Sequence, residues 1–259
     1  MNILKKIGWI IAWPFVAIIC YIHFISCNTS GKRYIKDPSC ATVEERYEKI
    51  KKFLKYFLYW KNIKIEIIGK DKIDNKTMLF VANHKSNVDP LVLLKISLDQ
   101  NIPYLTFVAK KELEGTKLGN IASLLDVIYI DRNNLRQVVK TINEEVDMLI
   151  KEKRSVCIFP EGTRIFDNNK FGEFKPGALE AAYQTYVSIQ PVVIFNSSGL
   201  LDKNVKSPKN RTVYVSFLNP YQAQNFINVD KVNFSKKLQK TMFDEYNNIK
   251  EKVNKENAK

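Results

Sequence analysis

The chain after residue 62 alternates short apolar runs with amphipathic helical patterns, and this alternation limits the possible folds more than any other feature. Strands are predicted over residues 63–68, 78–82, 103–109, 127–130, 155–159, 189–195 and 213–217. Helices are predicted over residues 89–98, 118–125, 134–151, 178–186 and 233–255. Strands that alternate with helices are typical of an α/β sheet with substantial parallel pairing. We therefore predict a mixed, largely parallel sheet with flanking helices, formed by one domain over residues 63–259.

An uncharged stretch precedes this domain. Residues 7–26 carry no formal charge, and a helix of this length is long enough to cross the hydrocarbon core of a bilayer. Trp9, Trp13 and Tyr21 suit a membrane–water interface, and Pro14 is expected to kink the helix. We predict a membrane anchor here. A cleaved signal peptide and a buried helix of a soluble protein are the alternatives.

A second helix with a basic face is predicted over residues 42–60. Its apolar residues recur at helical spacing, and its lysines lie largely off that stripe, as in a helix that rests on a membrane surface. An ordinary helix packed on the domain is the alternative. Residues 1–62 contain 11 Lys or Arg and 4 Asp or Glu, so they hold half of the net charge of +14. This asymmetry favours an N-terminal membrane-anchoring segment over residues 1–62.

Composition excludes several classes of protein. Apolar residues make up 45% and charged residues 26%, which is not the composition of a disordered chain. The net charge indicates anionic partners, which include nucleic acid, anionic lipid headgroups and phosphorylated substrates. Four scattered cysteines and two histidines do not form a zinc-binding pattern, so no metal site is predicted. Any chemistry that depends on histidine falls to His84, because His23 lies in the apolar N-terminal run.

His84 and Asp89 follow the apolar strand predicted over residues 78–82 and precede a helix. Open α/β sheets bind their ligands at the carboxyl ends of strands. A turn at this point could place the Asp89 carboxylate on one imidazole nitrogen, which would orient the ring and stabilise the imidazolium. The other nitrogen could then accept a proton from an alcohol. The alternative is that Asp89 only caps the helix.

Two arginines also follow predicted strands. Arg132 comes directly after the strand over residues 127–130, and Arg164 follows the strand over residues 155–159. Two guanidinium groups at the same sheet edge would bind a phosphate through paired hydrogen bonds. A surface salt bridge is the alternative for each of them.

Four blocks of the chain follow one another in a fixed order. They are Asn83-His84-Lys85-Ser86-Asn87-Val88-Asp89; Ala109-Lys110-Lys111-Glu112-Leu113 with Ile128-Tyr129-Ile130-Asp131-Arg132; Phe159-Pro160-Glu161-Gly162-Thr163-Arg164 with Phe174-Lys175-Pro176-Gly177-Ala178; and Gln190-Pro191-Val192-Val193-Ile194. Together they resemble the motifs of the glycerolipid acyltransferase family, specifically its 1-acyl-sn-glycerol-3-phosphate acyltransferases. The resemblance covers residues 63–217. The chain departs from the usual family residues at Asp126, Ile165 and Gln190.

The resemblance implies acyl transfer from an acyl thioester to the free hydroxyl of lysophosphatidic acid, which makes phosphatidic acid. It implies that His84 is the general base and that Asp89 orients it. The implied substrate-binding residues are Arg132, Glu161, Gly162, Thr163, Arg164 and Lys175, and backbone N–H groups near Lys110 are a weaker candidate for an oxyanion hole. No cofactor is implied. Acyl-CoA or an acyl carrier protein would be the co-substrate, and glycerol 3-phosphate or another lysophospholipid is the alternative acceptor.

Other classes have less support from the sequence. It shows no recognition helix, RNP-like strand or zinc finger, so nucleic acid is not an expected partner. It also shows no G-x-S-x-G nucleophile elbow, which argues against a serine hydrolase. A non-catalytic lipid-binding protein stays open as an alternative. We expect the protein on an anionic membrane surface with its domain on the cytosolic face, because the acyl donors are expected in the cytosol.

Overall fold

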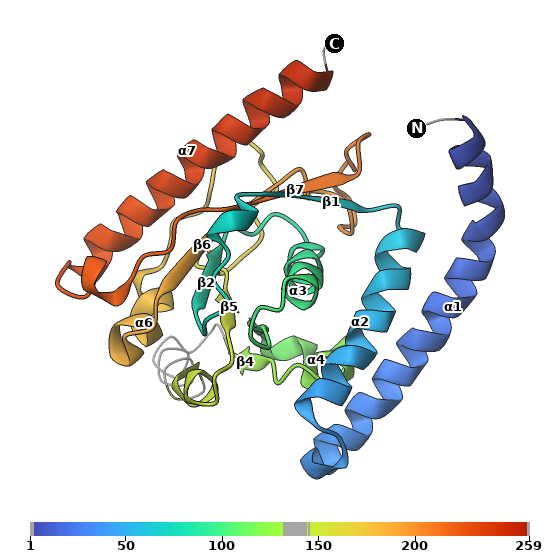
Figure 1. Ribbon diagram of the computed structural model, residues 1–259, viewed down its shortest axis with the longest axis horizontal. Coiled ribbons are helices and arrows are strands. Elements are labelled where there is room, and N and C mark those ends of the chain that lie inside the picture. The colour runs from blue at the N-terminus through green and yellow to red at the C-terminus, as the bar shows by residue number, and fades with distance from the viewer. Residues whose placement is uncertain (1–2, 132–143, 145, 258–259) are drawn as a thin grey trace. The chain divides into compact units, whose positions relative to one another are not determined.

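The computed structural model describes residues 3–131, 144 and 146–257, which group into two compact units (Figure 1). Unit 1 consists of Met1–Lys64 and Glu112–Val127. Unit 2 consists of Ile65–Lys111 and Ile128–Lys259. Residues 112–127 fall inside the predicted domain 63–259 but pack with the N-terminal helices of unit 1.

A seven-stranded sheet dominates unit 2. Its strand order is β1-β7-β6-β2-β5-β3-β4. The strands are β1 (Lys64–Ile68), β2 (Leu79–Ala82), β3 (Thr106–Lys110), β4 (Ile128–Ile130), β5 (Val156–Ile158), β6 (Ile189–Phe195) and β7 (Thr212–Phe217). Strand β2 pairs in parallel with β5 and β6, and β3 pairs in parallel with β4 and β5, whereas β6 and β7 are antiparallel. The predicted fold class, a mixed and largely parallel sheet with flanking helices, is confirmed.

The central strands are buried on both faces, which explains their continuous apolar sequences. All residues of β2, β5 and β6 are buried. Alternate residues, such as Leu79, Val81 and Val156, pack into one core cluster with Phe234 and Met242 of the C-terminal helix. Because successive side chains of a strand point to opposite faces, the intervening residues serve the other face of the sheet.

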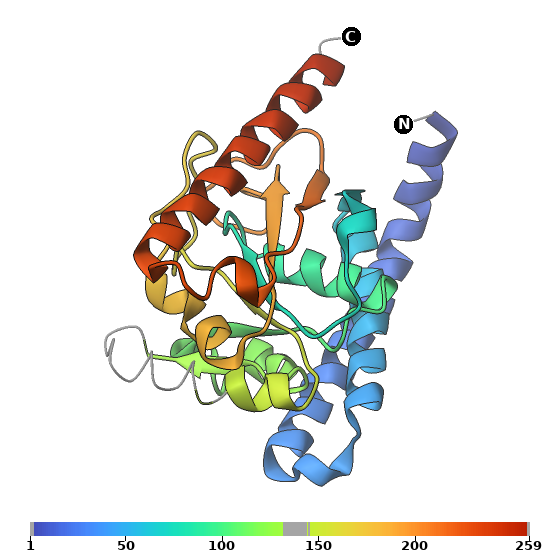
Figure 2. The same ribbon diagram turned by 60° about the vertical axis from the view of Figure 1, so that its left-hand side comes forward.

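Helices cover the sheet of unit 2 on both sides. They are α3 (Asp89–Asp99), α6 (Glu180–Thr185) and α7 (Lys231–Asn257), with short 3₁₀ turns at Lys70–Lys72, Pro176–Leu179 and Ala223–Asn225. A further 3₁₀ turn, Lys111–Leu113, lies where the chain passes from unit 2 to unit 1. Figures 1 and 2 show α7 and α3 on opposite sides of the sheet. The helix predicted over residues 134–151 lies mostly outside the described residues, although residues 146–151 are helical.

Unit 1 is helical. Its elements are α1 (Ile3–Lys36), a 3₁₀ turn (Pro38–Cys40), α2 (Val43–Trp60) and α4 (Lys117–Ser123). Helix α1 runs on through Pro14, and α2 begins with a capping box in which Thr42 and Glu45 bond to each other's backbone N–H groups. Within the described residues, one segment, Ala12–Lys36, is long and apolar enough to cross a membrane.

Candidate active site

The side chains of His84 and Asp89 meet just beyond the carboxyl end of β2. His84 Nδ1 lies 2.9 Å from Asp89 Oδ2, and the Asp89 side chain is fully buried. The same carboxylate oxygen accepts the backbone N–H groups of Lys85 and Ser86, each at 2.7 Å. Both donors precede the helix, so this oxygen closes the turn between strand and helix and faces the imidazole.

The imidazole ring of His84 is held in one orientation. It stacks on the ring of Phe159, which follows β5, with 4.2 Å between ring centroids and an interplanar angle of 22°. Its side chain is 16% exposed. When Nδ1 donates its proton to the carboxylate of Asp89, Nε2 is the nitrogen that carries the lone pair and can accept a proton. This arrangement suits general base chemistry.

Glu161 connects the backbone of His84 to a later loop. One carboxylate oxygen accepts the His84 N–H at 2.8 Å, and the other accepts the Gly172 N–H at 2.7 Å. Burial raises the pKa of this carboxyl group, and the two backbone hydrogen bonds act in the opposite direction. The carboxylate of Glu161 therefore links the main chain at His84 to the main chain at Gly172, and its side chain is almost completely buried.

The loop that Glu161 holds also surrounds a buried lysine that the motif analysis did not select. Lys85 is completely buried, and its ammonium group donates hydrogen bonds to the backbone carbonyls of Asp167 and Lys170. The same group lies 5.2 Å and 5.3 Å from the ring centroids of Phe171 and Tyr246. Burial lowers the pKa of Lys85 to about 8.

Arg164 reaches the first motif through Asp202, a second residue that sequence reasoning missed. The Arg164 guanidinium forms an ion pair with the Asp202 carboxylate. The other oxygen of that carboxylate accepts the Ser86 hydroxyl at 2.5 Å. Asp202 is only 1% exposed, whereas Arg164 is 36% exposed and lies over the ring of Phe166. One acidic residue after β6 offers too weak a sequence signal to reveal this link.

Asn83, at the start of the His84 motif, is hydrogen-bonded to strand β6, the neighbour of β2. Its side-chain nitrogen donates to the carbonyl of Ile194 at 2.9 Å, and its side-chain oxygen accepts the N–H of Ile194 at 2.7 Å. Both bonds are buried and join the ends of β2 and β6. The first sequence block, which contains Asn83, and the fourth, which contains Ile194, are therefore joined by two hydrogen bonds.

The other candidate residues lie in different settings. Gly162 has a φ of +67°, and a Cβ there would lie 3.2 Å from Lys175 Nζ, so the exposed Lys175 lies beside the Gly162 turn. Thr163 is exposed. Lys110 is exposed at the end of β3, and β3 runs parallel to β5. Arg132 lies outside the described residues.

Asp126, Gln190 and Ile165, which depart from the family pattern, each form hydrogen bonds in the structure. Asp126 belongs to unit 1, where its carboxylate accepts hydrogen bonds from the Tyr34 hydroxyl at 2.6 Å and from Arg46 at 2.7 Å. Gln190 is buried in β6 and donates to the carbonyl of Leu218 at 2.6 Å. Ile165 donates its backbone N–H to the carbonyl of His84 at 2.8 Å. Asp126 is thus satisfied within unit 1.

Comparisons with known proteins bear on the family of the chain. The family model described as Acyltransferase matches residues 64–195. A probable 1-acyl-sn-glycerol-3-phosphate acyltransferase from Mycoplasma genitalium is 37% identical over 93% of this chain and 92% of the relative. One from Mycoplasma pneumoniae is 34% identical over 90% of this chain and 88% of the relative.

The fold also has a solved counterpart. The crystal structure of the 1-acyl-sn-glycerophosphate (LPA) acyltransferase PlsC from Thermotoga maritima matches with a TM-score of 0.69. The match covers 95% of this chain and 98% of that protein at 20% sequence identity, so it bears on the fold alone. Together, the family model and the two mycoplasma relatives place the chain in the acyltransferase family, among the 1-acyl-sn-glycerol-3-phosphate acyltransferases.

Proposed function

We propose that the chain transfers an acyl group from an acyl thioester to the free sn-2 hydroxyl of 1-acyl-sn-glycerol 3-phosphate. The product is phosphatidic acid, a precursor in phospholipid synthesis. Family membership supports this reaction, and the contact of 2.9 Å between His84 Nδ1 and Asp89 Oδ2 is the observation that carries it. The pair has the geometry of a base and its orienting carboxylate.

In this mechanism Nε2 of His84 takes the proton of the acceptor hydroxyl. The hydroxyl oxygen attacks the thioester carbonyl and forms a tetrahedral intermediate. Collapse of the intermediate breaks the carbon–sulfur bond, and the leaving thiolate takes the proton back from the imidazolium. Asp89 stabilises the imidazolium while it exists, because its carboxylate is already hydrogen-bonded to Nδ1. No acyl-enzyme forms, and acyl-CoA or an acyl carrier protein supplies the acyl chain without a further cofactor.

The substrate phosphate is assigned to the cationic residues that follow the strands. Arg164 keeps further N–H donors beyond the one that bonds Asp202, and Lys175 lies beside the Gly162 turn. Arg132 is the third candidate, and Thr163 is a further candidate for direct contact with substrate. Glu161 acts through the backbone of His84, which its carboxylate holds. Backbone N–H groups near Lys110 are the candidates for stabilising the oxyanion.

Unit 1 supplies the membrane contact in this proposal. Several large apolar side chains of α1 are exposed, among them Phe15 at 65%, Ile18 at 60% and Ile22 at 58%. Exposed apolar surface of this kind is stable in lipid and costly in water. We assign anchoring to residues 1–62 and catalysis to residues 63–259, with the catalytic domain on the cytosolic face. A shallow embedding in one leaflet fits this orientation better than a full crossing, because it leaves Lys5 and Lys6 on the cytosolic side.

One assay tests the reaction. Purified protein is given acyl-CoA or acyl carrier protein thioesters, each with lysophosphatidic acid or glycerol 3-phosphate as acceptor. The proposal expects phosphatidic acid from lysophosphatidic acid with at least one donor. Acylation of glycerol 3-phosphate alone would overturn the assigned acceptor, and no transfer in any combination would overturn the assigned activity.

A further inference from the structure

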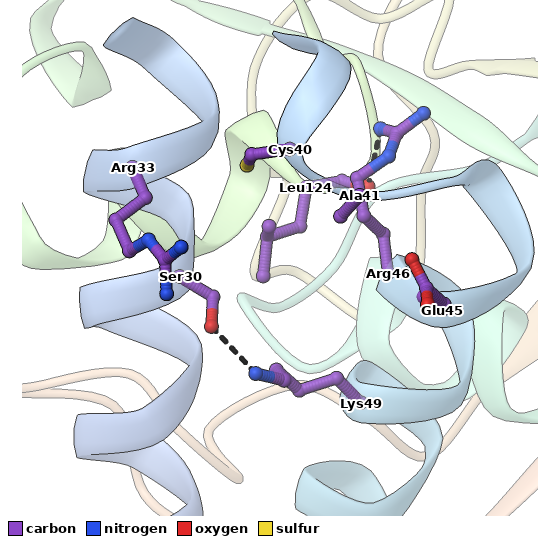
Figure 3. A pocket seen from close by; sticks show the side chains of 8 residues that line it. All are labelled: Ser30, Arg33, Cys40, Ala41, Glu45, Arg46, Lys49 and Leu124. Carbon is purple, nitrogen blue, oxygen red and sulfur yellow. Dashed lines mark hydrogen bonds between the residues drawn. The ribbon is translucent and has the colours of Figure 1, made fainter. Parts of the chain in front are cut away.

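A cavity of about 300 Å³ lies within unit 1, between the carboxyl-terminal end of α1 and the amino-terminal end of α2; Figure 3 shows the side chains that line it. We call it the cationic pocket. Helix α1 supplies Ser30 and Arg33, helix α2 supplies Arg46 and Lys49, and Cys40 lines it from the connecting turn. None of these residues belongs to the candidate active site.

The charges around the pocket are only partly compensated. The Arg46 guanidinium is bound to the Asp126 carboxylate at 2.7 Å and to the Leu124 carbonyl at 2.8 Å. Glu45, which also lines the pocket, uses its carboxylate to accept the N–H of Thr42. Lys49 donates to the Ser30 hydroxyl at 2.6 Å, which is a neutral partner.

Arg33 is the most available cation of the pocket. It is exposed, and none of the ion pairs seen in the described part of the chain involves it. Asp37, four residues further on, lies within electrostatic range of Arg33 but forms its hydrogen bonds with Ser39. The planar guanidinium of Arg33 and the ammonium of Lys49 thus converge with the Ser30 hydroxyl on one space (Figure 3). This donor set suits a phosphate group.

The exposed face of α1 places the pocket next to the apolar surface. Along that face the exposed residues Ile18, Ile22 and Ile25 are followed by Lys32 and Arg33. At a rise of about 1.5 Å per residue, Arg33 lies roughly 12 Å beyond Ile25 along the helix. In a helix that buries this apolar face in one leaflet, Ser30 and Arg33 follow the apolar residues toward the carboxyl-terminal end, where cationic and hydroxyl side chains can meet lipid headgroups.

We propose that the cationic pocket binds the phosphate of an anionic membrane phospholipid. The proposal rests on the membrane docking proposed above, and it adds a defined headgroup site to that docking. A membrane lipid, and not a free anion, is the occupant, because the pocket continues the apolar face of α1. Bound in this way, a headgroup would fix how far α1 enters the leaflet.

Cys40 offers a direct probe of the pocket. It lines the cavity and is exposed, whereas Cys20, Cys27 and Cys157 are buried. The full-length protein in neutral detergent is treated with a thiol reagent, alone or with dihexanoyl phosphatidylglycerol. Dihexanoyl phosphatidylcholine and inorganic phosphate are the comparison ligands. Phosphatidylglycerol is neither the substrate nor the product of the proposed reaction, so the readout is independent of catalysis.

We expect phosphatidylglycerol to slow the alkylation of Cys40 at least fivefold and phosphatidylcholine to leave the rate unchanged. The double variant Arg33→Gln/Lys49→Gln should lose the protection. The matched variant Lys52→Gln/Lys55→Gln removes the same charge from exposed positions of α2 outside the pocket and should keep it. Circular dichroism checks that both variants fold, and Arg33→Lys with intact Lys49 provides a milder change.

Three results would overturn the proposal. Equal protection by phosphatidylcholine would show that the acyl chains alone are responsible. Protection by inorganic phosphate at the same concentration would identify a free-anion site. Equal loss in the two double variants would show that diffuse surface charge attracts the lipid. Failure of the acyl-transfer assay with intact protection would instead count against the proposed function alone.

Discussion

At the scale of single residues, one oxygen of Asp89 organises the candidate active site. Asp89 Oδ2 lies within hydrogen-bond distance of His84 Nδ1 and of two backbone N–H groups. Three donors on one buried oxygen fix the carboxylate in place before any substrate arrives. An imidazole bonded to such a carboxylate needs little reorganisation when it becomes charged.

His84→Ala should abolish acyl transfer, because the chain has only two histidines and His23 belongs to unit 1. Asp89→Asn should lower kcat by roughly 10²–10⁴-fold, as in other His–Asp pairs. His23→Ala is the matched control and should stay near wild type, since its ring stacks on Tyr56 within unit 1. Steady-state kinetics on variants with native circular dichroism provide the test. A folded His84→Ala protein with near wild-type turnover would contradict the assignment.

Asp202 should act on substrate binding through Arg164. Asp202→Asn keeps the size of the side chain but removes the charge that orients the guanidinium and accepts the Ser86 hydroxyl. We expect the KM for lysophosphatidic acid to rise about tenfold or more, with a smaller change for the acyl donor, because charge-assisted contacts are worth about 1.5–3 kcal/mol. Arg164→Ala should show the same split between substrates. An equal change in both KM values would indicate that Asp202 only supports the fold.

Lys85 predicts a specific pH dependence of stability. Burial lowers its pKa from 10.5 to about 8, so between these values the unfolded chain binds more protons than the folded one. Above pH 10.5 Lys85 is neutral in both states, and burying it carries no charge penalty. As the pH falls from 10.5 to about 8, the unfolded chain takes up the proton first, so the folded state loses stability. Urea unfolding of wild type and Lys85→Met at several pH values from about 7.5 to 10 compares the two proteins.

The free energy of unfolding of wild type should rise with pH relative to Lys85→Met, by up to about 3 kcal/mol across the whole interval. Other titrating groups are shared by both proteins and cancel in the difference. Curves that stay parallel over this interval would show that the lysine titrates as it does in water.

The motif residues could be predicted from sequence because their signal is local. His84 and Asp89 are five residues apart, and the strand before them and the helix after them were both recognisable. Lys85 and Asp202 could not be predicted. Their partners come from the loop near Lys170 and from Arg164, and no sequence spacing shows that these segments meet.

At the scale of elements, the described strands and the described helices after residue 42 were predicted to within a few residues, whereas α1 (Ile3–Lys36) continues ten residues beyond the predicted stretch 7–26. The predicted strand over residues 103–109 begins at Thr106 in the structure. The helix predicted over residues 178–186 begins instead as a 3₁₀ turn, Pro176–Leu179. How α4 packs was not predictable, because its contact with α1 depends on the absence of a side chain. A Cβ on Gly31 would lie 1.6 Å from the carbonyl oxygen of Asn120.

Gly31→Ala should therefore destabilise unit 1, because the added methyl group overlaps the backbone of α4 and forces the two helices apart. Overpacking of this kind costs about 1–3 kcal/mol, which corresponds to a fall in Tm of roughly 3–10 °C for a chain of this size. Thr29→Ala, on the exposed face of the same helix, is the control. Thermal unfolding followed by circular dichroism measures both, and equal Tm values would show that α1 and α4 separate without cost.

At the scale of the whole molecule, the largest prediction is how the chain meets the membrane. Residues 1–62 hold half of the net charge, and α1 carries an exposed apolar face. A Cys introduced at position 2 of a Cys40→Ser protein reports topology through a membrane-impermeant reagent added to intact cells. Shallow embedding predicts protection of that Cys. Labelling from outside would show that α1 spans the membrane.

The order in which the chain is made gives the bonds between Asn83 and Ile194 a further consequence. The two residues are 111 positions apart, and the ends of β2 and β6 are joined through them. At about 5–20 residues per second, a ribosome needs on the order of 5–20 seconds to make the intervening chain. The apolar α1 is complete long before then. The nascent chain can therefore reach the lipid through α1 before Ile194 has been made and bonded to Asn83, the neighbour of His84. The candidate active site is then completed only after α1 has met the membrane.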